Sequence, residues 1–462
     1  MLMRRLLLAA LTMALITVSL HGLEFSARAY TDYYGLIDPA TFYEHERARV
    51  AVSPQLSGSL TPWLSFRLGA VLYAQFFSEP QFIDPVDIIR EAYIRLRFES
   101  LDLYLGQKFV NWGKVDILSP INVINHSDTF VLSMDNFFEA SFSDILAQAG
   151  LYLTDQFDIE LVYVPFFQPN RYAIDEILLQ QSLVLIHPGI PTRYFEVDVA
   201  FVNEQVPLFS EWAHSAHLAL NFATRWFDAI LSYSFFRDKH LDFDLGDIKE
   251  EISTEILSST HVIEGKGRPE YNRIHNIGMG ISFYLEEFLV SSDIALKITP
   301  DIEGTDIAKK NSEIFWALQI ERLISVVDTP VRLQVNGFFR QILGADTQPD
   351  SPYSEILTAY LNAIIDDYTN QKPPTQFYLL AHFDTSFIYN TLLVSGNFIY
   401  GFSESIYKIE PSFFAAPRVT YRISDYLSVA VGADFWWGGT AEGFLGRNEE
   451  KDNFFLRLQF EI

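Results

Sequence analysis

The C-terminal end of the chain alternates between apolar and polar residues, and this pattern restricts the folds open to it. The apolar residues occupy every second position, at Phe454, Leu456, Leu458, Phe460 and Ile462. The positions between them include Arg457, Gln459 and Glu461. Successive side chains of a β-strand point to opposite faces of a sheet. This segment is therefore expected to be a strand with one apolar face and one polar face.

The same alternation recurs along most of the chain. We count 18 such segments, at 23–34, 44–56, 63–75, 89–99, 102–109, 144–153, 157–164, 212–223, 226–237, 271–283, 287–299, 313–322, 330–341, 376–387, 391–402, 409–423, 426–437 and 452–462. Most are close to the roughly 9–11 residues that a tilted transmembrane strand requires. Short connections alternate with long ones, and the long ones are 110–143, 165–211, 238–270 and 342–375.

This rhythm is typical of outer-membrane barrels, with short periplasmic turns and long extracellular loops. It predicts an all-β fold, a transmembrane antiparallel β-barrel of about 18 strands over residues 23–462, with 16 strands also possible. The even count places both termini on the periplasmic side. A soluble β-sandwich or solenoid would also alternate, but it would not explain the loop rhythm together with an export signal. Residues 173–186, inside the longest loop, could form a short helix.

The N-terminus carries the features of that signal. Residues 1–5 are basic and residues 6–20 are apolar, which is shorter than the ~20 residues of a membrane-spanning helix. Residues 1–22 are therefore predicted to be a signal peptide cleaved after Gly22, and the alternative is an uncleaved anchor. The chain has no cysteine, which suits an exported envelope protein without disulfides. The predicted location is the outer membrane.

The charge balance excludes one class of partner. The formal net charge is −26, and loss of Arg4 and Arg5 with the signal makes it −28. Nucleic-acid binding needs a basic surface, so we expect no nucleic-acid partner. With 49% hydrophobic residues, the chain is also unlike a disordered protein.

Basic residues concentrate on the polar faces of strands that become neighbours when the barrel closes. These ten residues form a predicted basic wall of the lumen, at Arg28, Arg47, Arg49, Arg67, Arg95, Arg97, Lys108, Arg418, Arg422 and Arg457. One interpretation is a cationic ladder that selects ions. The other is internal neutralisation by inward carboxylates at Glu24, Asp32, Glu91, Glu99, Asp102, Asp434 and Glu461. The two interpretations are compatible.

The loop after residue 109 interrupts the strand pattern with the sequence VNWGKVDILSPINVIN. Gly113 adds flexibility, and Pro120 lacks the N–H that a strand ladder needs. Asparagine side chains here can bond to the backbone and hold tight turns. The candidate constriction residues are Trp112, Gly113, Lys114, Asp116, Pro120, Asn122, Asn125, Asp128 and Asp135. The loop either folds into the lumen opposite the basic wall or packs on the rim, with Trp112 at the membrane interface.

This stretch also resembles the signature of a family of Gram-negative outer-membrane β-barrels of unassigned function. That signature combines a Gly-x-Gln element, a Trp-Gly step and a Pro/Asn-rich loop. The corresponding residues are Gly106 and Gln107, which are adjacent here, followed by Trp112, Gly113, Pro120, Asn122 and Asn125. Residues 162–171 and 271–282 resemble later segments of the same family. The resemblance implies a large porin-like barrel and gives no substrate.

Signals for catalysis are weak. His382, Asp384 and Ser386 share one face of a strand, but neighbours on a strand lie side by side without the convergence of a triad. Residues 242–247 resemble a calcium loop, yet Ser253 stands where a bidentate Glu belongs. We expect no enzyme activity, no cofactor and no metal.

The predicted function is a porin-like channel for passive diffusion of small polar or anionic solutes, lined by the basic wall and narrowed by loop 110–143. Expected partners are outer-membrane lipid, these solutes and the barrel-assembly machinery, which would bind strand 452–462. Three alternatives stay open: a transporter of hydrophobic compounds, an exporter of a surface polysaccharide, and a structural protein or adhesin with a closed lumen. The sequence does not determine the oligomeric state.

Overall fold

A computed structural model describes residues 23–36, 47–76, 88–127, 141–170, 180–186, 194–201, 214–239, 242–244, 262–304, 309–326, 329–344, 375–405, 408–438 and 452–462. The predicted signal peptide lies outside these residues. In the described residues, no helical segment combines the length and the apolar character of a membrane span.

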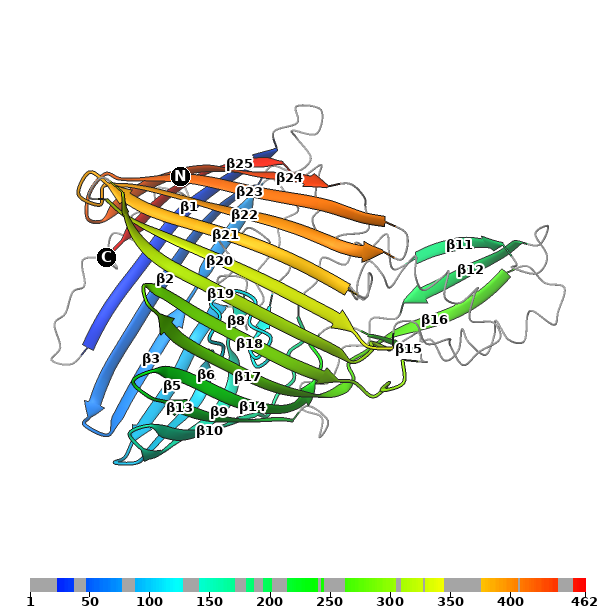
Figure 1. Cartoon of the computed structure of the whole chain (residues 1–462), viewed down its shortest axis with the longest axis horizontal. Helices are drawn as coiled ribbons and strands as arrows, with labels where there is room; N and C mark the ends of the chain where they lie inside the picture. Colours follow the sequence, from blue (N-terminus) through cyan, green and yellow to red (C-terminus); the bar gives the residue numbers. More distant parts are fainter. Residues whose placement is uncertain are drawn as a thin grey trace.

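One closed antiparallel β-barrel dominates the structure (Figure 1). Its strands are β1 (Leu23–Leu36), β2 (Arg47–Thr61), β3 (Leu64–Ala70), β4 (Leu72–Phe76), β5 (Ile89–Arg97), β6 (Leu101–Lys108), β9 (Asp144–Thr154), β10 (Phe157–Val164), β13 (Ser215–Ala223), β14 (Phe227–Arg237), β17 (Arg273–Leu285), β18 (Phe288–Ile298), β19 (Glu313–Val326), β20 (Thr329–Ile342), β21 (Thr375–Phe387), β22 (Leu392–Ser405), β23 (Lys408–Arg422), β24 (Leu427–Gly438) and β25 (Asn453–Glu461). β3 and β4 are two parts of the third span, and both pair with β2. The barrel therefore has 18 spans, which confirms the predicted fold and strand count.

The barrel closes between its first and last strands. β1 pairs with β25 in a register that sets Arg28 opposite Glu461. At the end of this seam, the Ala27 N–H donates to the Ile462 carbonyl at 3.1 Å, and the Ile462 N–H donates to the Ala27 carbonyl at 2.9 Å. Both ends of the barrel chain therefore lie at the end with the short turns (Figure 1).

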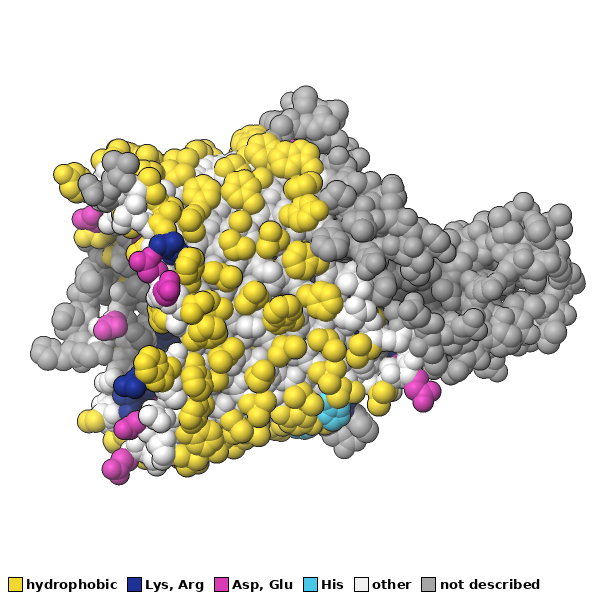
Figure 2. Space-filling view, in the orientation of Figure 1, with side chains coloured by type: hydrophobic (Ala, Val, Ile, Leu, Met, Phe, Trp, Pro, Cys, Tyr) yellow, Lys and Arg dark blue, Asp and Glu magenta, His cyan; other side chains and the backbone are white. Residues whose placement is uncertain are grey.

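The two faces of the wall have opposite character. The outer face seen in Figure 2 carries many exposed apolar side chains, and Met279 and Trp316 are among the exposed apolar residues of the barrel. The inner face buries polar side chains, among them Asp293, Gln319 and Asn336. This distribution is the reverse of a soluble protein and matches a wall between lipid and an aqueous lumen.

Two of the long connections contribute a second, smaller sheet beyond the loop end of the barrel (Figure 1). Its strands are β11 (Gln180–Ile186), β12 (Tyr194–Phe201), β15 (Asp242–Asp244) and β16 (Val262–Glu270). The helix predicted over 173–186 is wrong where β11 lies, and residues 173–179 are outside the described part. Short apolar runs such as this one do not distinguish a helix from a strand by periodicity. Here pairing with β12 decides the outcome.

A glycine shapes the exit of β6 into the following loop. Gly106 has a φ of +129°, a region that side-chain-bearing residues avoid. A Cβ at this position would lie 2.1 Å from the Ala92 carbonyl oxygen of β5. The next residue, Gln107, is buried, and its amide donates to the carbonyls of Ile89 at 2.7 Å and Ser143 at 3.3 Å. Gly106 thus allows β5 and β6 to approach closely, and the hydrogen bonds of the Gln107 side chain stabilise this arrangement.

We predict that Gly106→Ala lowers the free energy of unfolding by at least about 2 kcal/mol, because it adds both backbone strain and a clash. Urea unfolding of barrels refolded in lipid vesicles measures this. The matched control is Gly337→Ala in β20, where an added Cβ meets no atom within 4 Å. The control should change stability by less than about 0.5 kcal/mol. Equal losses in both variants would contradict this account.

Candidate functional site

The segment 110–125 lies inside the barrel, where it reaches across to the opposite wall (Figure 1). Its main anchor is Asp293 of β18, whose side chain is fully buried. The Asp293 carboxylate accepts hydrogen bonds from the N–H groups of Lys114 and Val115, both at 2.9 Å, and from the Ser119 hydroxyl at 2.6 Å. A buried carboxylate that receives three donors holds the segment firmly.

Polar contacts on both sides of Asp293 extend this attachment. Towards β10, the Trp112 indole N–H donates to Glu160 at 2.9 Å. Towards β19, Asp116 and Gln319 exchange two hydrogen bonds, each of 2.9 Å. The segment is therefore bonded to inward side chains of several strands.

Apolar packing reinforces the same placement. Trp112, Ile121 and Ile124 belong to a buried cluster with inward residues of β9, β10, β13 and β14. Val115 belongs to a second buried cluster, with Ala317, Phe338 and Leu380 of β19, β20 and β21. Segment 110–125 thus covers the wall from β9 to β21.

Two inward glycines of β17 make room for the segment. A Cβ on Gly278 would lie 3.0 Å from Ile121, and one on Gly280 would lie 3.1 Å from Lys114 and 2.3 Å from Asp293. The barrel wall is therefore hollowed where the segment packs. These glycines lie in 271–282, one of the stretches that carry the family resemblance.

Side chains within the segment fix its own turns. The side-chain amide oxygen of Asn122 accepts hydrogen bonds from the backbone N–H groups of Trp112, at 2.7 Å, and Gly113, at 2.9 Å. The Asn125 side chain bonds to both the N–H and the carbonyl of Val110. A Cβ on Gly113 would lie 2.4 Å from the Ser119 Cβ, which explains why glycine follows tryptophan here.

The far end of the segment is held by a buried lysine just beyond β14. The ammonium of Lys239 donates to the Ile124 carbonyl and to the Asp144 carboxylate. Asp144 also bonds to His126, at 2.9 Å. Burial lowers the pKa of Lys239, while the neighbouring carboxylate of Asp144 opposes that shift. This contact fixes the point where the segment returns to the wall.

The structure locates most of the predicted constriction residues. Trp112 is only 5% exposed and bonds to an inward glutamate, so it is not at the membrane interface. The Pro120 carbonyl accepts from Asn276 of β17 at 3.3 Å. Asp128 and Asp135 lie outside the described residues. The exposed residues of the segment are Asn111, Asp116 and Leu118.

Most cations of the predicted basic wall are paired with inward carboxylates. Asp32 binds both Arg49 and Arg457, at 2.9 and 2.6 Å. Asp102 pairs with both Arg95 and Arg97. The remaining pairs are Arg28–Glu461 at 3.2 Å, Arg67–Glu91 at 2.8 Å and Arg418–Asp434 at 3.6 Å. The Arg47 side chain is outside the described part of the structure.

The pairing is incomplete. Within the described part of the wall, nine cations stand against seven carboxylates, at Glu24, Asp32, Glu91, Glu99, Asp102, Asp434 and Glu461, so the net charge is +2. Lys108 and Arg422 form no ion pair with any described residue. The wall belongs to β23–β25 and β1–β6, the strands that segment 110–125 leaves uncovered.

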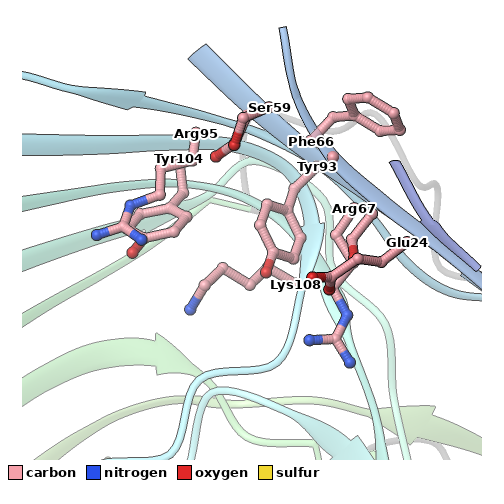
Figure 3. Close-up of a pocket in the computed structure, with 11 residues that line it drawn as sticks. Glu24, Ser59, Phe66, Arg67, Tyr93, Arg95, Tyr104 and Lys108 are labelled. Carbon is pink, nitrogen blue, oxygen red and sulfur yellow. The ribbon is translucent and has the colours of Figure 1, made fainter. Parts of the chain in front are cut away.

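The uncovered wall contains a cavity of about 330 Å³ (Figure 3). Arg67, Arg95 and Lys108 of the basic wall line it, together with Tyr93 and Tyr104. The two tyrosine rings are in contact, with centroids 5.8 Å apart. The cavity thus combines cations with aromatic faces.

Analysis of the sequence missed the partners of segment 110–125 on the wall, above all Asp293 and Glu160. The alternation in 287–299 and 157–164 does place both carboxylates on the inner face. No local pattern, however, indicates which segment of the chain would meet them. The wall glycines Gly278 and Gly280 were likewise visible only as part of a resemblance.

The candidate catalytic residues do not form a triad. His382 bonds to Asp384 at 3.1 Å and to Asn397 at 2.7 Å. The Ser386 hydroxyl instead donates to Asn390 at 2.6 Å, so it has no base. Across the described ranges, no group of three His, Cys, Asp or Glu residues could hold a metal ion.

The fold is shared with solved outer-membrane porins. A BenF-like porin from Pseudomonas fluorescens Pf-5 aligns with a TM-score of 0.52 at 8% identity, covering 96% of this chain and 98% of that one. OccK3 (OpdO) from Pseudomonas aeruginosa aligns with a TM-score of 0.50 at 10% identity, covering 95% of each chain. OpdK from the same organism, solved with vanillate, aligns with a TM-score of 0.50 at 8% identity, covering 95% of this chain and 98% of that one.

No family model and no curated protein sequence matches the chain. At these identities the likeness concerns the fold alone. The porin-like barrel is shown, and the family suggested by the Trp-Gly signature stays a prediction.

We predict that Asp293→Ala releases segment 110–125, because three donors lose a charged acceptor. Hydrogen bonds to charged groups contribute about 1.5–3 kcal/mol each. The amides of Lys114 and Val115 should therefore exchange about 10- to 150-fold faster, measured by hydrogen–deuterium exchange.

The matched control is Asp228→Ala, because the Asp228 side chain is half exposed and, among the described residues, bonds only to the Lys114 ammonium, at 2.7 Å. Exposed ion pairs contribute about 0–1 kcal/mol, so protection should change little. Similar exchange in both variants would show that Asp293 is not the anchor.

Proposed function

We propose that this chain is an outer-membrane channel through which small polar or anionic solutes diffuse passively. The closed barrel with an apolar outer face and a polar inner face supports a location in the outer membrane. We propose further that residues 1–22 are the cleaved export signal. The β25 strand, which closes the barrel against β1, would be the segment that the assembly machinery binds.

The observation that carries the proposal is the one-sided placement of segment 110–125. The segment packs against β9 to β21, and the side chains of Asn111 and Asp116 are exposed on it. Segment 110–125 leaves the basic wall of β23–β25 and β1–β6 uncovered. A solute path would therefore run between segment 110–125 and a surface with a net charge of +2, which attracts anions.

The paired state of the wall shapes the proposed mechanism. An arginine already bound to a carboxylate has donors left over and a fixed position, since Arg carries five N–H groups. Such residues can contact a passing anion without trapping it, as conduction requires. Segment 110–125 would restrict the aperture as a rigid element, because its hydrogen bonds join it to the wall at many points.

The first test is conductance. The mature chain, refolded and inserted in a planar bilayer, should give discrete current steps and a reversal potential that favours anions across a salt gradient. Folding can be checked by circular dichroism. A folded barrel that gives no steps would overturn the channel proposal in favour of a closed lumen.

Removal of two wall cations should weaken anion preference. Arg95→Ala with Arg97→Ala removes two cations and takes the net charge of the described wall from +2 to 0, and it leaves their shared partner Asp102 without either arginine. One unit charge at 4 Å contributes about 1 kcal/mol even in bulk water, so the anion-to-cation permeability ratio should fall about five-fold at low salt.

The control for this double variant is Arg225→Ala. Arg225 lies in a turn between β13 and β14 and stacks on Trp226, away from the lumen wall. Its loss should leave the reversal potential unchanged. The same permeability ratio in wild type and double variant would remove the basic wall from the mechanism.

A further inference from the structure

The cavity on the basic wall is built by two rows of cross-strand neighbours. The first row sets Glu24, Ser57, Arg67 and Tyr93 side by side on β1, β2, β3 and β5. The second row sets Ser59, Ser65, Arg95 and Tyr104 side by side on β2, β3, β5 and β6. Figure 3 shows side chains from both rows pointing into one hollow.

Two of the charged groups in this cavity are already neutralised. Arg67 pairs with Glu91 at 2.8 Å and also bonds to Gln55 at 3.2 Å. Arg95 pairs with Asp102. Neither arginine needs a further counter-ion.

Two other charged groups are not neutralised, and they have opposite signs. Among the described residues, the Lys108 ammonium donates only to the Phe109 carbonyl, at 3.1 Å, and it lies 4.7 Å from the centre of the Tyr104 ring. Glu24 lines the cavity and, among the residues that the structure describes, no cation pairs with it. The cavity therefore holds one cation and one anion that form no ion pair with any described residue.

The two free charges stand at opposite ends of the cavity. Glu24 is on β1 and Lys108 on β6, four strand steps apart along the wall. At ~4.8 Å per step, their backbones are separated by about 19 Å. The side chains shorten this gap from both ends, but a ligand that touches both must hold its own charges several ångströms apart.

The surface between the charges suits a compact, partly apolar solute. Tyr93 and Tyr104 present aromatic faces, and Ser57, Ser59 and Ser65 present hydroxyl groups that donate and accept. A volume of about 330 Å³ is at the lower end of the range for small-molecule sites.

We propose that this cavity binds a short zwitterionic peptide, with its carboxylate at Lys108 and its ammonium at Glu24. An extended dipeptide separates its terminal charges by about 7 Å, because each residue spans ~3.3–3.6 Å. A side chain of the peptide would pack on the tyrosine rings. This inference rests on the proposed channel function and names a solute class for it.

Three matched probes test the charge requirement directly. Gly-Phe is zwitterionic, its N-acetyl derivative is only anionic, and its C-terminal amide is only cationic. Saturation-transfer NMR on the folded protein in detergent measures the affinity of each. Gly-Phe should bind at least ten-fold more tightly than either capped form. Equal binding of Gly-Phe and the N-acetyl form would overturn the proposal, because the cavity would then be a simple anion site.

Variants assign each end of the ligand. Glu24→Gln should abolish the advantage of Gly-Phe over the N-acetyl form, and Lys108→Met should abolish its advantage over the amide. Glu286→Gln, in the turn between β17 and β18, is the control and should keep both ten-fold ratios. If Glu24→Gln keeps the full ratio, Glu24 is not the ammonium site and the proposal fails. The wild-type comparison with capped probes needs no variant to fold.

Conductance of the same preparation separates this inference from the proposed function. A channel that conducts but does not distinguish Gly-Phe from its capped forms overturns the peptide site and leaves the channel. Charge-dependent binding of Gly-Phe without conductance supports the peptide site and overturns the channel.

Discussion

The closed hydrogen-bond ladder is the constraint on which everything else in this structure depends. Hydrocarbon offers no partner for a backbone N–H or carbonyl, so each strand must be paired on both edges. The β1–β25 seam completes that pairing. Once the ladder is closed, alternation assigns each residue to lipid or lumen, and the polar residues of 18 spans must share one interior. The ion pairs and the inward segment are two ways of filling that interior while satisfying most of its charges and donors.

The barrel was predictable from the sequence because its defining signal is local. Period-two alternation and loop lengths are properties of short stretches, and they also placed the basic residues on one wall. The predicted count of spans is confirmed, with a break at Val71 that the pattern did not show. The failure over 180–186 has the same origin. A short apolar run gives no periodicity to interpret, and its strand exists because β12 pairs with it.

The arrangement inside the lumen was less predictable because it depends on contacts between distant residues. Lys114 and Asp293, for example, are 179 positions apart. Sequence parity shows that Asp293 faces inward, but it does not show which backbone N–H groups will reach it. The sequence indicated only that Gly113 and Asn122 suit a loop. The close approach of Gly113 to Ser119, and the hydrogen bond that the Asn122 side chain accepts from the Trp112 N–H, are visible only in the structure. Charge pairing was partly predictable. The sequence showed that carboxylates share the inner face with the arginines, but it did not show which groups pair or at what distance.

The long separation between segment 110–125 and its anchors has a consequence for assembly. The segment belongs to the first third of the chain, but Asp293 and Gln319 are contributed by strands that come much later. Contacts so distant in sequence form late, since the intervening chain must first be ordered. The early strands must therefore pair while this apolar, tryptophan-bearing segment still lacks the hollow at Gly278 and Gly280 that receives it. Any factor that shelters the half-built barrel has to tolerate an unplaced hydrophobic loop until the second half of the wall arrives.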